Sequence, residues 1–201
     1  MSTIGILAYG SLIQDPGVEI QPLVTERIPT QTPFPVEYAR LSGIRGGAPT
    51  VVPHSSGKPV RAEILVLHPS VSLPQAQALL WRRETRRMGT GKPYPAGNSP
   101  NSVLVSDLPG FHGLDHVLYT DFPAAGKLDR PTANELATAA VASVGKAPLD
   151  MDGISYLMQL SESGVETALT AEYRAKILCL TSAGSLAEAR NHLRDYHRKG
   201  G

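Results

Sequence analysis

The prolines of this chain are crowded into its first two thirds. Of its 17 prolines, only Pro148 follows Pro131 in the 201 residues. Proline cannot donate the backbone N–H that an internal helix position needs, so the proline-rich part favours short strands and turns. The proline-poor remainder favours helices. The distribution therefore predicts an α+β protein, with a strand-rich core at residues 1–130 and a helical extension at residues 131–201 packed on that core.

Within the first part, short apolar runs closed by turn residues predict strands. These runs are residues 4–9, 34–41, 60–67, 103–105 and 117–119. One helix is expected between the third and fourth runs, over residues 72–88. Ser72 can cap this helix, and Pro74 suits its first turn.

The second part carries helix boundary signals. Thr132 and Ser185 each stand three residues before a glutamate, which is the spacing of a capping box. Gly145 and Gly164 stand where helices commonly end. Residues 170–180 fit either a helix or a strand, and the sequence leaves that choice open.

Composition and charge exclude several classes of protein. The net charge of +1 and the 5% aromatic content argue against a nucleic-acid partner. No apolar run approaches the roughly 18 residues of a membrane span, and no basic leader precedes the first apolar run. We therefore expect a soluble cytoplasmic protein with no membrane partner.

Cysteine and histidine usage favours neither a disulfide nor a metal site. The single cysteine, Cys179, follows Ile177 and Leu178, so we expect a small buried apolar residue there. His112 and His116 are four residues apart, but the glycines and proline around them disfavour a helix that would align them on one face. No metal is expected.

The segment Tyr9-Gly10-Ser11-Leu12 follows the first predicted strand. A glycine-containing turn at a strand end exposes successive N–H groups, which can hold a carboxylate or a phosphate. An ordinary turn is the alternative. Ser11 lacks the flanking glycines of a nucleophile elbow, so a serine hydrolase is disfavoured.

Glu84 stands in line with Leu73 and Leu80 along the predicted helix. This places one carboxylate at the inner end of an apolar row, where it could transfer protons. Burial would favour its neutral form and the arginines at positions 82, 83, 86 and 87 its charged form. The alternative is a solvated helix end with glutamate–arginine pairs.

Together, these segments resemble the γ-glutamyl cyclotransferase superfamily, which includes the AIG2-like and ChaC-like proteins. The resemblance spans about residues 4–125 and rests on features in the family's order: Tyr9-Gly10-Ser11-Leu12, a Gly- and Pro-rich stretch at 43–53, a strand at 60–67, the helix acid Glu84, Tyr94 and Tyr119. The resemblance implies a small mixed, partly closed β-barrel with a helical C-terminal extension.

The same resemblance implies a cofactor-free reaction, in which a small γ-glutamyl amine, peptide or conjugate cyclises and releases 5-oxoproline. Glu84 would be the general acid and base, and N–H groups of Gly10, Ser11 and Leu12 would bind the α-carboxylate. Tyr9, Tyr94 and Tyr119 would bind or orient the substrate.

Two questions stay open at this point. The arginine-rich flank of Glu84 favours an anionic leaving portion, held by Arg82 and Arg86. A catalytically inactive binding or regulatory module with the same fold is the alternative function, and the direction of the Glu84 carboxylate would discriminate between the two.

Overall fold

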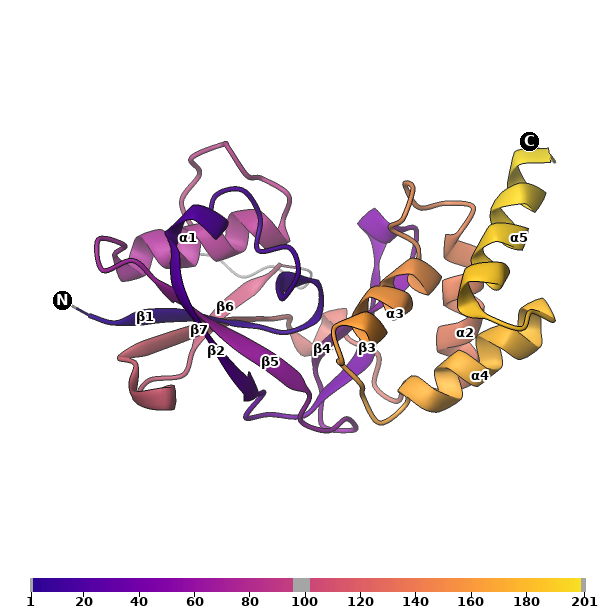
Figure 1. The fold of residues 1–201 in the computed structure, drawn as a ribbon, viewed down its shortest axis with the longest axis horizontal. Coiled ribbons are helices and arrows are strands. Elements are labelled where there is room, and N and C mark those ends of the chain that lie inside the picture. Colours follow the sequence, from indigo (N-terminus) through magenta and orange to yellow (C-terminus); the bar gives the residue numbers. More distant parts are fainter. Residues whose placement is uncertain (1, 96–101, 200–201) are drawn as a thin grey trace. The chain divides into compact units, whose positions relative to one another are not determined.

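The computed structural model describes residues 2–95 and 102–199 (Figure 1). Its strands are β1 Ile4–Ala8, β2 Val24–Gln31, β3 Val36–Ser42, β4 Ala48–Pro53, β5 Arg61–Leu67, β6 Leu104–Asp107 and β7 His116–Asp121. Its α-helices are α1 Leu73–Glu84, α2 Ala133–Ser143, α3 Gly153–Glu162, α4 Thr170–Thr181 and α5 Leu186–Lys199. No helix in this described part is both long enough and apolar enough to cross a membrane.

The chain forms two compact units. The first unit comprises Met1–Pro33 with Val60–Gly126, and the second comprises Phe34–Pro59 with Lys127–Gly201. Residues 34–59, which the sequence analysis placed in the core with the rest of residues 1–130, thus group with the helices. The units differ in this respect from the expected division at residue 130.

The first unit is built on a mixed five-stranded sheet of order β2-β5-β1-β7-β6. The central strand β1 is buried along its whole length and pairs antiparallel with β5 and parallel with β7. Gly5 is needed in this strand, because a Cβ there would lie 2.6 Å from Ile64 Cγ2 of β5. Since β1 ends at Ala8, Tyr9 begins a loop at the end of the central strand. The α+β prediction is confirmed.

The sheet does not close into a barrel over the described residues, which corrects the expectation of a partly closed one. Its edge strands are β2 and β6. Closure requires that the two edges of a sheet meet through hydrogen-bonded strands. The remaining strands, β3 and β4, pair instead with each other as a separate antiparallel sheet in the second unit.

Helix α1 packs against β7, β6 and β1 of the first unit. Ala76, Leu79 and Leu80 are among its buried residues, as the apolar periodicity predicts. The helix ends at Glu84, four residues earlier than expected. Arg86 shows why, because its positive φ of 56° leaves the helical conformation.

In the second unit, the β3–β4 hairpin packs against α2 and α3. Tyr38 of β3 is fully buried, and its ring meets that of Tyr173 from α4 edge to face at a centroid distance of 5.0 Å. Aromatic rings bury large apolar areas, so this contact joins the hairpin to the helices. Strands β2 and β4 were not among the strands expected as separate runs, because neither forms an uninterrupted apolar run.

Several helix boundary signals act as expected, although Ser72 stands at the N-cap of α1 without a side-chain cap hydrogen bond. Thr132 forms the full capping box of α2, and Gly164 follows α3 with a φ of +68°. Gly145 has another role: a Cβ there would lie 2.7 Å from the ring of His197. The open choice at residues 170–180 resolves to the helix α4. Cys179 lies on its outer face and is exposed, so the expectation that it is buried was wrong.

Candidate functional site

The predicted binding loop begins where β1 ends. Residues Gly10–Leu12 form one tight helical turn, and Gly10 adopts a φ of +71°, which glycine reaches without strain. The turn is closed by hydrogen bonds from Ile13 N to Gly10 O and from Asp15 N to Ser11 O. The first N–H groups of a helical turn have no acceptor inside the turn. The loop can therefore offer N–H donors to an anion.

Glu84 is the last residue of α1. Its side chain is 22% exposed, and its Oε1 accepts a hydrogen bond of 2.6 Å from Arg83 Nη1. A carboxylate at a helix C-terminus faces the negative end of the helix dipole. The adjacent guanidinium offsets this repulsion, so the carboxylate is held in place and does not extend freely into solvent.

Arg83 joins Glu84 to the binding loop. Its Nη2 lies 3.3 Å from Ser11 Oγ, and its Nε donates to Asp15 O at 3.1 Å. The side chain is 11% exposed. Glu84 and the Tyr9–Leu12 loop, which are more than 70 positions apart in the sequence, thus share one guanidinium.

The three candidate tyrosines lie along the β6–β7 strand pair. Tyr9 donates its hydroxyl to Thr120 O at 2.7 Å, and Tyr94 accepts from Val105 N at 3.0 Å. Val105 and Thr120 are direct cross-strand partners, and Tyr119 directly precedes Thr120 in β7. Tyr9 therefore connects the binding loop to the same pair of strands that Tyr94 reaches.

Arg82 and Arg87 of the flank have separate partners. Arg82 is buried and donates to Glu19 at 2.9 Å and to Lys92 O at 2.8 Å. The hydrogen bond from Arg82 is the main cause that lowers the pKa of Glu19. Arg87 lies over the ring of Trp81 at 5.1 Å. Arg82 is thus committed to the fold, which corrects the expectation that it holds a leaving group.

The sequence pattern indicates Glu84 and the Tyr9–Leu12 loop as candidates but does not single out Arg83. The signal was its position directly beside the acid. Four arginines share that stretch, however, and periodicity alone does not select one of them. Ser11 has Arg83 as a side-chain partner, and a guanidinium remains protonated, so this contact supplies no base for a serine nucleophile.

His112 and His116, which were not expected to bind a metal, each have another hydrogen-bond partner. His112 bonds Thr30 Oγ1 at 2.9 Å, and His116 bonds Asp107 Oδ2 at 2.6 Å. Within residues 2–95 and 102–199, no three histidine, cysteine, aspartate or glutamate side chains gather in a way that could hold a metal ion.

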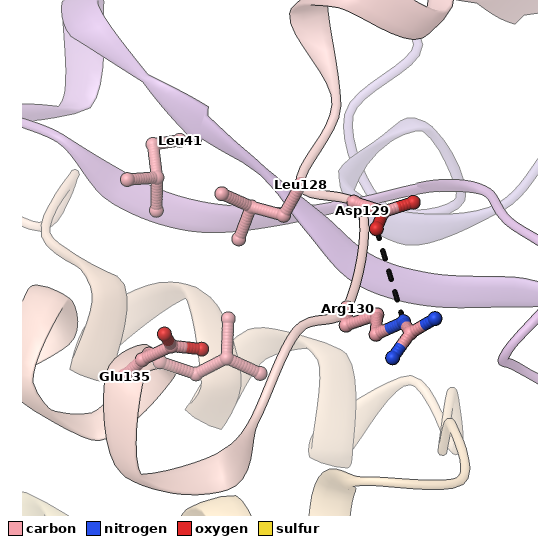
Figure 2. Close-up of a pocket in the computed structure, with 6 residues that line it drawn as sticks. Leu41, Leu128, Asp129, Arg130 and Glu135 are labelled. Atoms are coloured by element: carbon pink, nitrogen blue, oxygen red, sulfur yellow. Dashed lines mark ion pairs between the residues drawn. The ribbon is translucent and has the colours of Figure 1, made fainter.

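A pocket of about 360 Å³ lies in the second unit and contains none of the predicted site residues (Figure 2). It is lined by Leu41, Leu128, Asp129, Arg130, Glu135 and Leu136. Asp129 and Arg130 form an ion pair of 3.8 Å, but their side chains are 99% and 93% exposed. Ion pairs this exposed contribute little to stability or selectivity.

The chain was compared with protein-family models, curated proteins and solved structures. The chain matches no protein-family model and no curated protein. A solved yeast structure matches the chain over nearly its whole length. It is described as a glutathione-specific γ-glutamyl cyclotransferase, with 12% identity and a TM-score of 0.43 over 98% of this chain and 99% of that one.

Proposed function

We propose that this protein is a γ-glutamyl cyclotransferase-like enzyme that releases 5-oxoproline from a small γ-glutamyl amine, peptide or conjugate. The observation that carries the proposal is the link from Glu84 through Arg83 to Ser11. It puts the only carboxylate of α1 beside the turn that offers N–H donors. In the proposal, a proton-transfer group and an anion-binding loop belong to one site.

The reaction needs a proton acceptor next to an amine. The α-ammonium group of the substrate gives a proton to Glu84, and the resulting amine attacks its own γ-carbonyl carbon. The bond from that carbon to the leaving nitrogen then breaks, and Glu84 returns its proton to the leaving nitrogen. The ring nitrogen loses its second proton to the leaving amine through solvent, so the products are 5-oxoproline and a free ammonium group.

Much of the catalytic task is to fold a flexible chain. Ring closure is intramolecular, so holding the glutamyl group in its attack geometry removes a large part of the entropic barrier. In the proposal, Gly10, Ser11 and Leu12 bind the α-carboxylate, and Tyr9, Tyr94 and Tyr119 orient the substrate. No cofactor takes part in any step.

The proposal is tested by mass-spectrometric detection of 5-oxoproline. The purified protein is incubated with a panel of γ-glutamyl amines, γ-glutamyl dipeptides and glutathione. We expect release by the wild type and its loss in Glu84→Gln. A matched control is Glu63→Gln on β5, whose carboxylate is 16% exposed and accepts from Arg27 at 2.9 Å.

Each outcome assigns the site differently. If Glu84→Gln still releases 5-oxoproline, the proposed reaction is supported, but Glu84 is not its general acid and base. Absence of release from every substrate would favour the alternative function, a binding or regulatory module without catalytic activity. An equal loss in Glu63→Gln would indicate that loss of any half-buried ion pair disables the fold.

A further inference from the structure

Arg83 is the cation of the candidate site, and its acceptors differ in charge. Ser11 Oγ and Asp15 O are neutral, whereas Glu84 Oε1 is anionic. A guanidinium has five N–H donors in a planar fork that suits a carboxylate. The two neutral contacts hold the guanidinium against the loop, so its position does not depend on Glu84 alone.

We propose that Arg83 joins the N–H groups of Gly10, Ser11 and Leu12 in binding the substrate α-carboxylate, and that this carboxylate displaces Glu84 from Arg83. The inference rests on the proposed function for the role of Glu84 as proton acceptor. The physical reason is charge balance. One largely buried cation beside one anion is neutral, and a second anion that arrives without displacing the first leaves a net negative site.

Displacement would bring the reacting groups together. In a γ-glutamyl group, the α-carboxylate and the α-ammonium are attached to the same carbon. A carboxylate that takes the place of Oε1 on Arg83 therefore sets the ammonium beside the carboxylate it has displaced. The freed Oε1 accepts the ammonium hydrogen bond and then its proton, so carboxylate recognition and proton transfer become one event.

Arg82 and Arg87 do not offer the same exchange. Arg82 is buried against Glu19 and Lys92 O, and Arg87 lies over Trp81. Arg83 contacts both Ser11 of the loop and Glu84. Selectivity for a substrate with an α-carboxylate should accordingly depend on Arg83.

Binding without turnover gives the first test. The probes are 5-oxoproline and glutarate, which carry carboxylates, and 2-pyrrolidinone, which has the ring of 5-oxoproline without its carboxylate. Titration calorimetry of the wild type should detect the first two and not the third. Arg83→Gln should weaken carboxylate binding roughly 10- to 100-fold, as expected for loss of charge-assisted hydrogen bonds. Arg87→Gln, with the same change of charge, should leave binding within about twofold, as expected for an exposed charge.

Glu84→Gln provides the decisive variant. It removes the competing anion, so carboxylates should bind about two- to fivefold more tightly, as expected for loss of a partly exposed ion pair. Unchanged or weaker carboxylate binding in Glu84→Gln would overturn the displacement of Glu84. If Arg83→Gln fails to fold, as judged by circular dichroism, the gain in Glu84→Gln decides the question alone.

Turnover then separates this inference from the proposed function. The substrates are γ-glutamylalanine and 4-aminobutanoylalanine, which has the same amine and the same ring closure but no α-carboxylate. Arg83→Gln should lower kcat/KM for the first roughly 10- to 100-fold more than for the second, because both substrates lose the support that Arg83 gives to Glu84 and only the first also loses a carboxylate contact. If carboxylate binding depends on Arg83 but no 5-oxoproline is released, the proposed enzymatic activity is refuted and the carboxylate site at Arg83 is supported. Release with carboxylate binding that is absent, or equal in Arg83→Gln and Arg87→Gln, would overturn this inference and keep the enzyme.

Discussion

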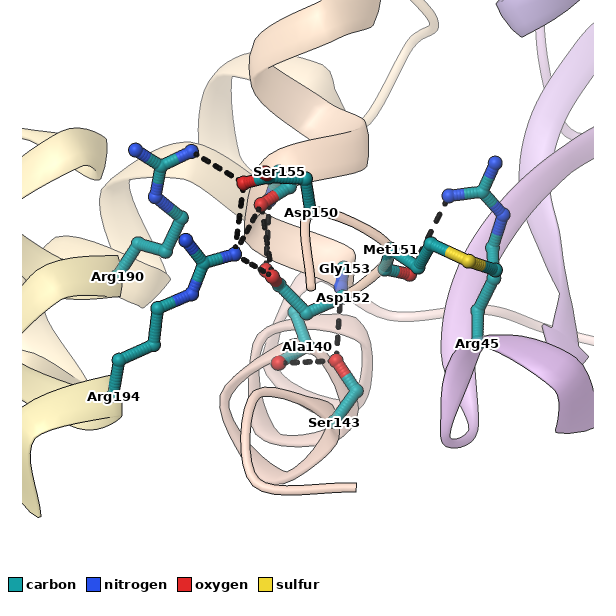
Figure 3. Close-up of polar contacts among 10 residues, drawn as sticks. All are labelled: Arg45, Ala140, Ser143, Asp150, Met151, Asp152, Gly153, Ser155, Arg190 and Arg194. Atoms are coloured by element: carbon teal, nitrogen blue, oxygen red, sulfur yellow. Dashed lines mark hydrogen bonds and ion pairs between the residues drawn. The ribbon is translucent and has the colours of Figure 1, made fainter. Parts of the chain in front are cut away.

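Helix α5 is attached to α3 by an ion pair that is buried on one side (Figure 3). Asp152 caps α3 by accepting from Ser155 N and Oγ, both at 2.8 Å. Arg194 of α5 donates Nη2 to Asp152 at 2.9 Å and to Asp150 at 3.0 Å. Burial by itself lowers the pKa of Arg194, but its bonds to the two aspartates outweigh this and raise it. Arg190, one turn earlier, reaches only the more exposed Asp150, at 3.4 Å.

The magnitude of the attachment follows from the exposure of the two partners. The Asp152 side chain is 2% exposed and the Arg194 side chain is 18% exposed. Exposed pairs contribute about 0–1 kcal/mol, whereas removal of one partner of a fully buried pair costs about 3–5 kcal/mol. Ser155 still donates to Asp152 when the arginine is removed. We therefore expect Arg194→Gln to lower the free energy of unfolding by about 2–3 kcal/mol.

Chemical and thermal unfolding measure this loss directly. For a chain of this size the expected decrease in Tm is about 4–12 °C. Arg190→Gln is the matched control and should change stability by less than about 0.5 kcal/mol. A double-mutant cycle with Asp152→Asn should give a coupling of at least about 1 kcal/mol. Equal losses in the two arginine variants, or no loss in Arg194→Gln, would refute the argument from burial.

Two further predictions concern buried positions. Gly5→Ala puts a Cβ 2.6 Å from Ile64 Cγ2, so it should destabilise the protein by about 1–3 kcal/mol in urea unfolding; an unchanged midpoint would mean that β5 yields freely. Burial, with the charge of Asp152 and neighbouring Tyr156, raises the pKa of Tyr173. The unfolded chain therefore loses this proton first, and above about pH 10 stability should fall by about 1.4 kcal/mol per pH unit. Tyr173→Phe should remove that part of the slope in urea unfolding at alkaline pH; parallel curves for both proteins would contradict the assignment.

The candidate site was only partly predictable from the sequence. The Tyr9–Leu12 loop and Glu84 were named because a short apolar run ends at one and an apolar helical row ends at the other. Arg83 was not distinguished from its neighbours. On a helix, adjacent residues project about 100° apart, so helical periodicity does not predict the pairing of Arg83 with Glu84 at the end of α1.

By itself, the sequence determined the local elements of this protein. Its signals are the positions of proline and glycine, the apolar runs and the capping box of Thr132. Each acts within a few residues, so it can be recognised from the sequence alone. Tertiary structure alone decided that the sheet of the first unit stays open and that residues 34–59 join the helices. It also decided which arginine holds Glu84. These outcomes depend on contacts between residues far apart in the chain, and local preference carries no information about such partners.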